Sequence, residues 1–142
     1  MTTIAYVRGA MAADTLMIKG TTIIGQCVKI VRREKDGALC GGAGNLAWVQ
    51  AFHIWFLDGE NTDLPPMTEY DNGIIVRDGD GEIEIFEDGG SFCFEPRYAA
   101  IGSGKDFALA AMSLGADAET AIKTAMGFDP GTGGEVTVLS HE

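Results

Sequence analysis

The chain opens with Met1-Thr2-Thr3-Ile4-Ala5-Tyr6-Val7, a stretch in which a threonine directly follows the initiator methionine. Once Met1 is removed, Thr2 carries a free α-amine beside its own hydroxyl. A hydroxyl is a weak nucleophile until a base takes its proton, and the amine of an N-terminal threonine is one such base. Because the reference pKa of an α-amine is about 8, part of it is neutral near pH 7. One residue can therefore supply both a nucleophile and its base.

The residues that follow have the pattern of paired strands. Thr3 to Val7 is a short β-rich run, and Ala10 to Ala13 is a second small apolar run beyond a glycine turn. Two such runs predict a hairpin, with Asp14 at the end of its second strand. A further strand is expected from Gln26 to Val31, and it carries Lys29. Met17 to Thr22, between these two units, is ambiguous.

The middle of the chain predicts one helix between strands. Ala38 to Gly44 is an apolar run that ends in glycines, typical of a strand that leads into a flexible backbone segment. Leu46 to Leu57 has large apolar side chains at helical spacing, and Asn45 before it favours a helix N-terminus. Beyond a loop, three more strands are expected, at Ile74–Val76, Glu82–Phe86 and Ser91–Phe94.

The last third of the chain predicts two helices and a closing strand. The helices are expected at Lys105–Leu114 and from Asp117 to about Gly127, with Asp117 as the N-cap. The strand is expected at Glu135–Ser140. Helices segregated from antiparallel strands predict an α+β layer fold rather than a doubly wound sheet. Without repeats or a linker, residues 1–142 are expected to form a single domain.

The composition narrows the class of protein. Hydrophobic residues make up 46% of the 142 residues and charged residues 22%, as in soluble domains. No apolar run approaches the roughly 18 residues that a membrane span needs, and no signal peptide is recognised. Three cysteines without metal-site spacing indicate reduced thiols and a cytoplasmic protein. The net charge of −11 argues against a nucleic-acid surface.

Motifs for other kinds of chemistry are incomplete. Ile101–Lys105 resembles a phosphate loop, but Asp106 stands where that loop needs Ser or Thr. Asp78–Glu82 resembles the start of a calcium loop, but the required glycine and the distal glutamate are missing. A zinc site or a serine triad would have to use His53 or His141, the only histidines. We therefore expect no cofactor and no metal.

Six short features lie in order along the chain: Thr2-Thr3-Ile4, Ala13-Asp14-Thr15, Val28-Lys29-Ile30, Gly41-Gly42-Ala43-Gly44, Ile101-Gly102-Ser103-Gly104, and Asp129 with Thr132-Gly133-Gly134. In this order they resemble the proteasome β-subunit family, and in style its bacterial HslV-type peptidases, which are N-terminal-nucleophile hydrolases. Two features depart from that pattern. The chain is shorter than most family members, and Pro130 stiffens the backbone beside Asp129.

The resemblance implies a catalytic role for each matched position. The Thr2 hydroxyl would attack the scissile carbonyl to form an acyl-enzyme that water resolves. Lys29 would depress the pKa of the Thr2 amine and assist proton transfer, and Asp14 would hold Lys29 charged and oriented. With Met1 attached, the Thr2 nitrogen is an amide and cannot act as a base.

Four further positions complete the implied site. The Gly41 N–H would stabilise the tetrahedral oxyanion, which needs preorganised backbone donors. Ser103 and Asp129 would hydrogen-bond near the Thr2 amine, and Thr132 belongs to the turn that supports Asp129. Four of the matched positions have a simple structural alternative. Ser103 would be a turn residue, Asp129 a helix-ending residue, Asp14 a strand-end cap and Lys29 an exposed strand cation.

The resemblance also implies a fold and a function. The fold is a four-layer αββα sandwich, and the function is a threonine peptidase that cleaves unfolded polypeptides inside a homo-oligomeric ring. A ring ATPase unfoldase is the implied partner, because a closed chamber excludes folded proteins. Two alternatives stay open: an N-terminal-nucleophile amidase that cuts a small amide, and a noncatalytic ring subunit.

The helix expected at Leu46–Leu57 bears on assembly. Its aromatic residues span more than one narrow stripe, whereas a surface helix usually buries only one face. They are Trp48, Phe52, Trp55 and Phe56. An exposed aromatic patch usually marks an interface, so this helix is expected at a subunit contact in a ring. The alternative is that all the aromatic side chains pack inside the monomer.

Overall fold

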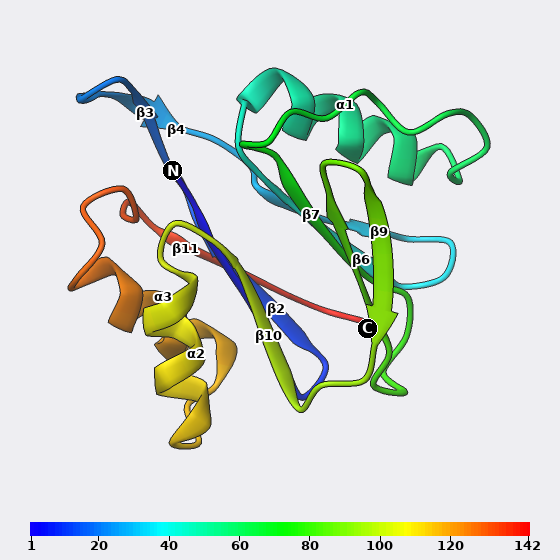
Figure 1. The fold of residues 1–142 in the computed structure, drawn as a ribbon. Helices are drawn as coiled ribbons and strands as arrows, with labels where there is room; N and C mark the ends of the chain where they lie inside the picture. The colour runs from blue at the N-terminus through cyan, green and yellow to red at the C-terminus, as the bar shows by residue number, and fades with distance from the viewer.

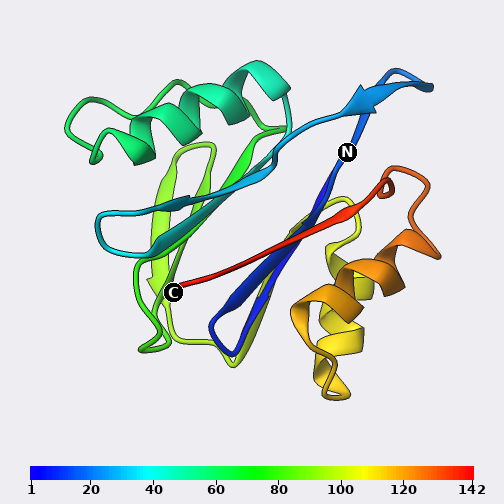
Figure 2. The ribbon, with the colours of Figure 1, turned by 180° about the vertical axis from the view of Figure 1, so that it is seen from behind.

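The computed structural model describes residues 1–142 as three helices and eleven strands in three sheets (Figure 1). The predicted α+β class is confirmed. The strands pair only in antiparallel fashion, and the helices lie in two separate groups (Figure 2).

The first sheet has four strands in the order β10-β1-β2-β11. Their bounds are Thr3–Val7 for β1, Ala10–Asp14 for β2, Tyr98–Gly102 for β10 and Val136–Ser140 for β11. β1 and β2 form the predicted hairpin. Both residues of its turn, Arg8 and Gly9, have positive φ values of 50° and 79°, the geometry that matches the twist of paired strands.

The second sheet has five strands in the order β5-β6-β7-β8-β9. Their bounds are Ile30–Arg33, Ala38–Ala43, Asn72–Val76, Ile83–Glu87 and Gly90–Phe94. A separate two-stranded hairpin is made by β3 (Leu16–Lys19) and β4 (Thr22–Gln26). The strand predicted at Gln26–Val31 is therefore wrong in its extent, because β4 ends at Gln26 and β5 begins only at Ile30.

The helices are α1 (Leu46–Leu57), α2 (Lys105–Ser113) and α3 (Ala118–Met126). Asp117 caps α3 as predicted, since its side chain accepts a hydrogen bond from the Thr120 N–H at 2.8 Å. Asn45 precedes α1 without a side-chain cap. Its N–H donates instead to Asp71 Oδ1 at 2.9 Å. None of the helices is long and apolar enough to cross a membrane.

Three apolar clusters hold the elements together. The largest lies between the two main sheets, where Ile4 and Met11 of one sheet meet Leu39 and Ile74 of the other. A second cluster packs α2 and α3 on the outer face of the β1 sheet. A third packs α1 on the outer face of the β6 sheet. The two sheets thus face each other, with helices on both outer faces (Figures 1 and 2).

The aromatic side chains of α1 belong to the third cluster. Trp48, Phe52 and Phe56 are buried, and Trp55 is partly buried against the same cluster. Trp48 and Phe52 stack with ring centroids 4.7 Å apart, and Phe52 meets Phe86 of β8 edge to face at 5.2 Å. The prediction of an exposed aromatic patch on this helix is wrong, because sheet and loop side chains cover it from two sides.

Candidate active site

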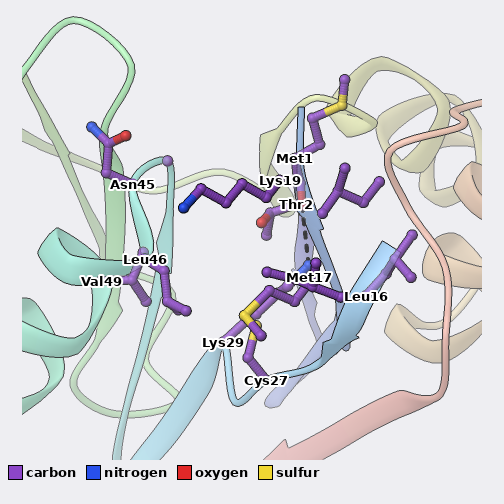
Figure 3. A pocket seen from close by; sticks show the side chains of 14 residues that line it. Met1, Thr2, Leu16, Met17, Lys19, Cys27, Lys29, Asn45, Leu46 and Val49 are labelled. Carbon is purple, nitrogen blue, oxygen red and sulfur yellow. Dashed lines mark hydrogen bonds between the residues drawn. The ribbon is translucent and has the colours of Figure 1, made fainter. Parts of the chain in front are cut away.

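Thr2 immediately precedes β1 and lines two cavities, one of about 420 Å³ (Figure 3) and one of about 310 Å³. Gly44 also lines both cavities. Thr2 is only 5% exposed, yet no protein group hydrogen-bonds its hydroxyl. Since no buried side-chain polar atom in the structure lacks a partner, the hydroxyl must reach solvent. The predicted nucleophile therefore has an open approach from a cavity.

Lys29 and Asp14 form a buried ion pair next to Thr2. The Lys29 Nζ lies 3.0 Å from both carboxylate oxygens of Asp14, and both side chains are almost fully buried. The third N–H of Lys29 donates to the Met1 carbonyl at 3.1 Å. A lone buried charge is costly, so each side chain compensates the charge of the other and fixes its position.

Asp14 also ties the surrounding backbone together. Its Oδ1 accepts from the Thr3 N–H and its Oδ2 from the Gly133 N–H, both at 3.1 Å. A carboxylate can accept about four hydrogen bonds, and these two complete the set begun by Lys29. β1, β2 and the turn before β11 are thereby joined at one side chain.

A second hydrogen-bond chain reaches the Thr2 nitrogen from the opposite side. The Thr2 N–H donates to Ser103 Oγ at 3.3 Å, and Ser103 Oγ donates to Asp129 Oδ2 at 2.6 Å. Thr132 Oγ1 donates to the same Asp129 oxygen at 2.6 Å. Burial by itself raises the pKa of Asp129, but these bonds and the Gly131 N–H outweigh it and lower that pKa. Asp129 is therefore held as an anion.

Thr3 is a supporting residue that sequence reasoning missed. Because the Thr132 hydroxyl proton is given to Asp129, Thr3 Oγ1 must be the donor in its 2.7 Å contact with Thr132 Oγ1. A Cβ at Gly104 would collide with Thr3 Oγ1, so this glycine lets the loop before α2 approach β1. A second threonine after Thr2 is the only sequence signal for this contact.

Gly41 is the one predicted site residue that the structure does not bring to Thr2. It lies inside β6, where a Cβ would strike Ile4 and Ile30 in the layer between the sheets. The Gly42 N–H points toward β5 and donates to the Lys29 carbonyl at 3.1 Å. Since N–H directions alternate along a strand, the Gly41 N–H points away, toward β7.

Gly44 occupies the position at Thr2 that was expected of Gly41. It follows the end of β6, has a φ of +118°, and lines both cavities. Gly44 is two residues beyond Gly42, so its N–H points to the same side of β6 as the Gly42 N–H. At this level β5, which begins at Ile30, is no longer beside β6. No protein acceptor is bonded to the Gly44 N–H. A free backbone donor beside a candidate nucleophile is what an oxyanion needs.

His53 supports the site from α1. Its Nε2 lies 3.2 Å from the Lys29 carbonyl. Burial lowers the pKa of His53, and the bond to that carbonyl acts in the opposite direction. The ring is therefore neutral near pH 7, and Nε2–H donates to Lys29. Nothing in the sequence around His53 predicts this contact, and only the fold reveals which backbone the ring meets.

Met1 blocks the site in this form of the chain. Its carbonyl takes the third donor of Lys29, and its side chain lies against Gly131, where a Cβ would collide with it. The Thr2 nitrogen is an amide here. It can donate to Ser103, but it cannot accept a proton.

No cluster of three or more His, Cys, Asp or Glu side chains is suited to hold a metal ion. The three cysteines are free. Cys27 lines the larger cavity, and burial raises the pKa of its thiol, although Lys29 acts to lower it.

No protein-family model and no curated protein matches the chain. Solved structures do match its fold. Eukaryotic HslV from Trypanosoma brucei is 23% identical, with 99% of this chain and 100% of that chain covered and a TM-score of 0.71. BPH from Thiobacillus denitrificans in complex with epoxomicin is 18% identical, with 99% and 98% covered and a TM-score of 0.71.

A third match is the Gly-1 mutant of Anbu from Hyphomicrobium sp. strain MC1. It is 15% identical, with 97% of this chain and 80% of that chain covered and a TM-score of 0.74. At these identities the likeness concerns the fold. The chain has the fold shared by these HslV, BPH and Anbu structures.

Proposed function

We propose that the chain is a threonine-type peptidase in which Thr2, freed of Met1, is the N-terminal nucleophile. The observation that carries this proposal is the convergence of two hydrogen-bond networks on Thr2, the first of which is buried. The Lys29–Asp14 pair approaches from one side, and the Ser103–Asp129 chain holds the Thr2 nitrogen from the other. The fold shared with HslV supports the same assignment.

Removal of Met1 changes two groups at once. It converts the Thr2 amide into an amine, and it removes the carbonyl that holds the third N–H of Lys29. The ammonium is then free to face the Thr2 hydroxyl and to lower the pKa of the amine. The amine accepts the hydroxyl proton as the oxygen attacks the scissile carbonyl.

We assign oxyanion stabilisation to the Gly44 N–H instead of that of Gly41. The Gly44 amide is unbonded and faces the cavities at Thr2, and a donor fixed before the reaction stabilises charge without reorganising. Asp129 and Ser103 would hold the amine in place, and Thr132 would hold Asp129. The acyl-enzyme formed on Thr2 is then resolved by water.

The proposal extends to the whole assembly. Residues 1–142 would form one peptidase domain with the four-layer αββα sandwich of N-terminal-nucleophile hydrolases. Copies would form a cytoplasmic homo-oligomeric ring that encloses the sites and admits unfolded polypeptides. A ring ATPase would unfold those substrates.

The decisive test is the Thr2→Ala variant. It should abolish peptide hydrolysis while the fold and the oligomeric state remain, because the alanine has no hydroxyl. An epoxyketone-type or vinyl-sulfone probe should form an adduct on Thr2 in the processed protein, seen by mass spectrometry. Thr22→Ala, at an exposed threonine of β4, is the matched control. Turnover of Thr2→Ala within about tenfold of wild type, near 1.4 kcal/mol of barrier, would place the nucleophile elsewhere.

A noncatalytic ring subunit is the second candidate, because Met1 is seated against Gly131 and bonded to Lys29. Mass spectrometry of the N-terminus separates the two: a permanently retained Met1 favours this candidate. An amidase would instead be recognised by faster turnover of small amides than of long unfolded chains.

A further inference from the structure

The larger cavity beside Thr2, of about 420 Å³, has mainly apolar walls. They come from the β3–β4 hairpin, the segment that leads to Lys29, the end of β6 and the start of α1 (Figure 3). The apolar side chains include Leu16, Met17, Ile24, Cys27, Leu46 and Val49. A cavity of this size and lining can enclose one large side chain of a bound peptide.

The cavity is lined by positive charge, whereas the chain as a whole is negatively charged. The chain has 21 acidic and 10 basic residues, yet no Asp or Glu lines the cavity and two lysines do. Lys29 is neutralised by buried Asp14. Lys19, in contrast, is exposed at the end of β3 and makes neither an ion pair nor a hydrogen bond. Its side chain extends across the cavity toward Asn45 (Figure 3).

The position of the Thr2 nitrogen decides which part of a peptide enters this cavity. When an amide bond breaks, the leaving nitrogen must take up a proton, and the Thr2 amine is the nearest group to deliver it. That nitrogen is bonded to Ser103, which lines the smaller cavity with Tyr70 and Asn72. The leaving side of the peptide therefore lies over the smaller cavity, and the acyl side lies over the larger one.

We infer that the larger cavity selects peptides whose residue on the acyl side of the scissile bond is apolar or acidic, and that it rejects lysine and arginine there. The inference rests on the proposed peptidase function. The apolar walls bind the body of the side chain, and burial of its methylene groups supplies the affinity. The Lys19 ammonium attracts a carboxylate at the end of such a side chain and repels a cation.

A matched panel of fluorogenic peptides tests the preference. The peptides differ only in the residue that precedes the fluorescent leaving group, which is leucine, methionine, glutamate or lysine. Processed protein should cleave the leucine and methionine peptides with the highest kcat/KM and the lysine peptide at least about tenfold more slowly. The glutamate peptide should be cleaved faster than the lysine peptide. A lysine peptide cleaved as fast as the leucine peptide overturns the inference.

Reversal of one charge tests the cause. An ion pair between exposed groups changes a binding equilibrium by about 1.5- to 5-fold. Lys19→Glu replaces attraction by repulsion for the glutamate peptide, and repulsion by attraction for the lysine peptide. The ratio of glutamate to lysine cleavage should fall by at least about fivefold in this variant, because reversal of the charge changes two such contacts for each peptide. Lys35→Glu is the matched control, because Lys35 is an exposed lysine in the β5–β6 turn that does not line the cavity. It should leave the ratio unchanged. An equal fall in both variants would assign the preference to net charge.

A binding measurement separates failure of this inference from failure of the proposed function. If processed protein cleaves no peptide, titration of Thr2→Ala with uncleaved peptides still reports the cavity. Tighter binding of the leucine and glutamate peptides than of the lysine peptide supports the inference even then. Equal binding of all peptides, or no binding, overturns it.

Discussion

At the scale of single residues, the site depends on a charged pair that is removed from water. Lys29 and Asp14 are 15 residues apart in sequence, and both are buried with their charged atoms 3.0 Å apart. Nothing in the local pattern around either residue predicts this contact. It was expected only because the short motifs matched those of a known family, and the fold supports it by bringing the end of β2 next to the segment before β5.

Lys29→Ala should damage both stability and activity. Asp14 would be left buried without its cation, which typically costs about 3–5 kcal/mol, and peptide hydrolysis should fall at least about a hundredfold. Lys29→Arg should also fail, because a planar guanidinium cannot replace a compact ammonium. Urea unfolding and peptide turnover give the two effects. Lys123→Ala, at a surface lysine paired with Glu119, is the matched control and should leave the stability nearly unchanged, because solvent screens exposed ion pairs.

His53 should make the stability depend on pH. Burial lowers the pKa of His53 in the folded state, so on acidification the unfolded chain binds the proton first. The free energy of unfolding should therefore decrease as the pH falls below about 6.5, the ordinary pKa of histidine. His53→Gln does not titrate and should lose this part of the slope. Denaturant titrations between pH 8 and 5.5 measure it, and an identical slope in both proteins would contradict the assignment.

Some residues at the site could not be predicted from the sequence. The role of Gly44 depends on which way successive N–H groups point along β6, and this is set by the pairing of Lys29 with Gly42. A run of four residues with three glycines does not reveal that direction. His53 and Thr3 likewise act through backbone or side-chain atoms that are far away in sequence.

At the scale of elements, helix and strand bounds are predicted correctly where the apolar pattern is consistent with only one type of element. α1 was expected at Leu46–Leu57 and has these bounds, because a long apolar run between Gly44 and Asp58 leaves little choice. The segment around β3 and β4 was ambiguous. It contains a register shift between Met17 and Ile18, and Gly25 has a φ of +149°. Such irregular pairing weakens the alternation by which strands are recognised.

The turn from β6 into α1 should be sensitive to a single methyl group. Gly44→Ala would place a Cβ against Asp71 and the Tyr70 carbonyl at a positive φ. The resulting shift should lower kcat about 10²- to 10³-fold, the usual cost of losing an oxyanion donor. Gly9→Ala is the control, because Gly9 also has a positive φ but has open space around it. It should lose about 1 kcal/mol of stability and keep its kcat. Equal kcat values for both variants would exclude Gly44 as the donor.

At the scale of the whole molecule, the apolar surface left open is not the one expected. The aromatic side chains of α1 pack inside the monomer. They therefore no longer indicate that this helix lies at a subunit contact. Phe107 of α2 and Phe128 after α3 stack instead, with ring centroids 5.3 Å apart, and they remain 37% and 69% exposed. A paired aromatic surface from two elements is more typical of an interface than scattered single residues are.

We therefore expect a homo-oligomer in which Phe107 and Phe128 lie at a subunit contact. Light scattering at micromolar concentration should give a mass several times the 15.0 kDa of one chain. Replacing both residues by serine should reduce that mass, because the contact would lose the apolar area that the two rings bury. Leu114→Ser is the matched control. Leu114 is 91% exposed but is not part of the stacked aromatic pair, and single exposed apolar residues are common on monomers. A 15.0 kDa monomer with full peptidase activity would contradict the proposed ring. It would also contradict the proposed ATPase partner, because no closed chamber would then exclude folded substrates.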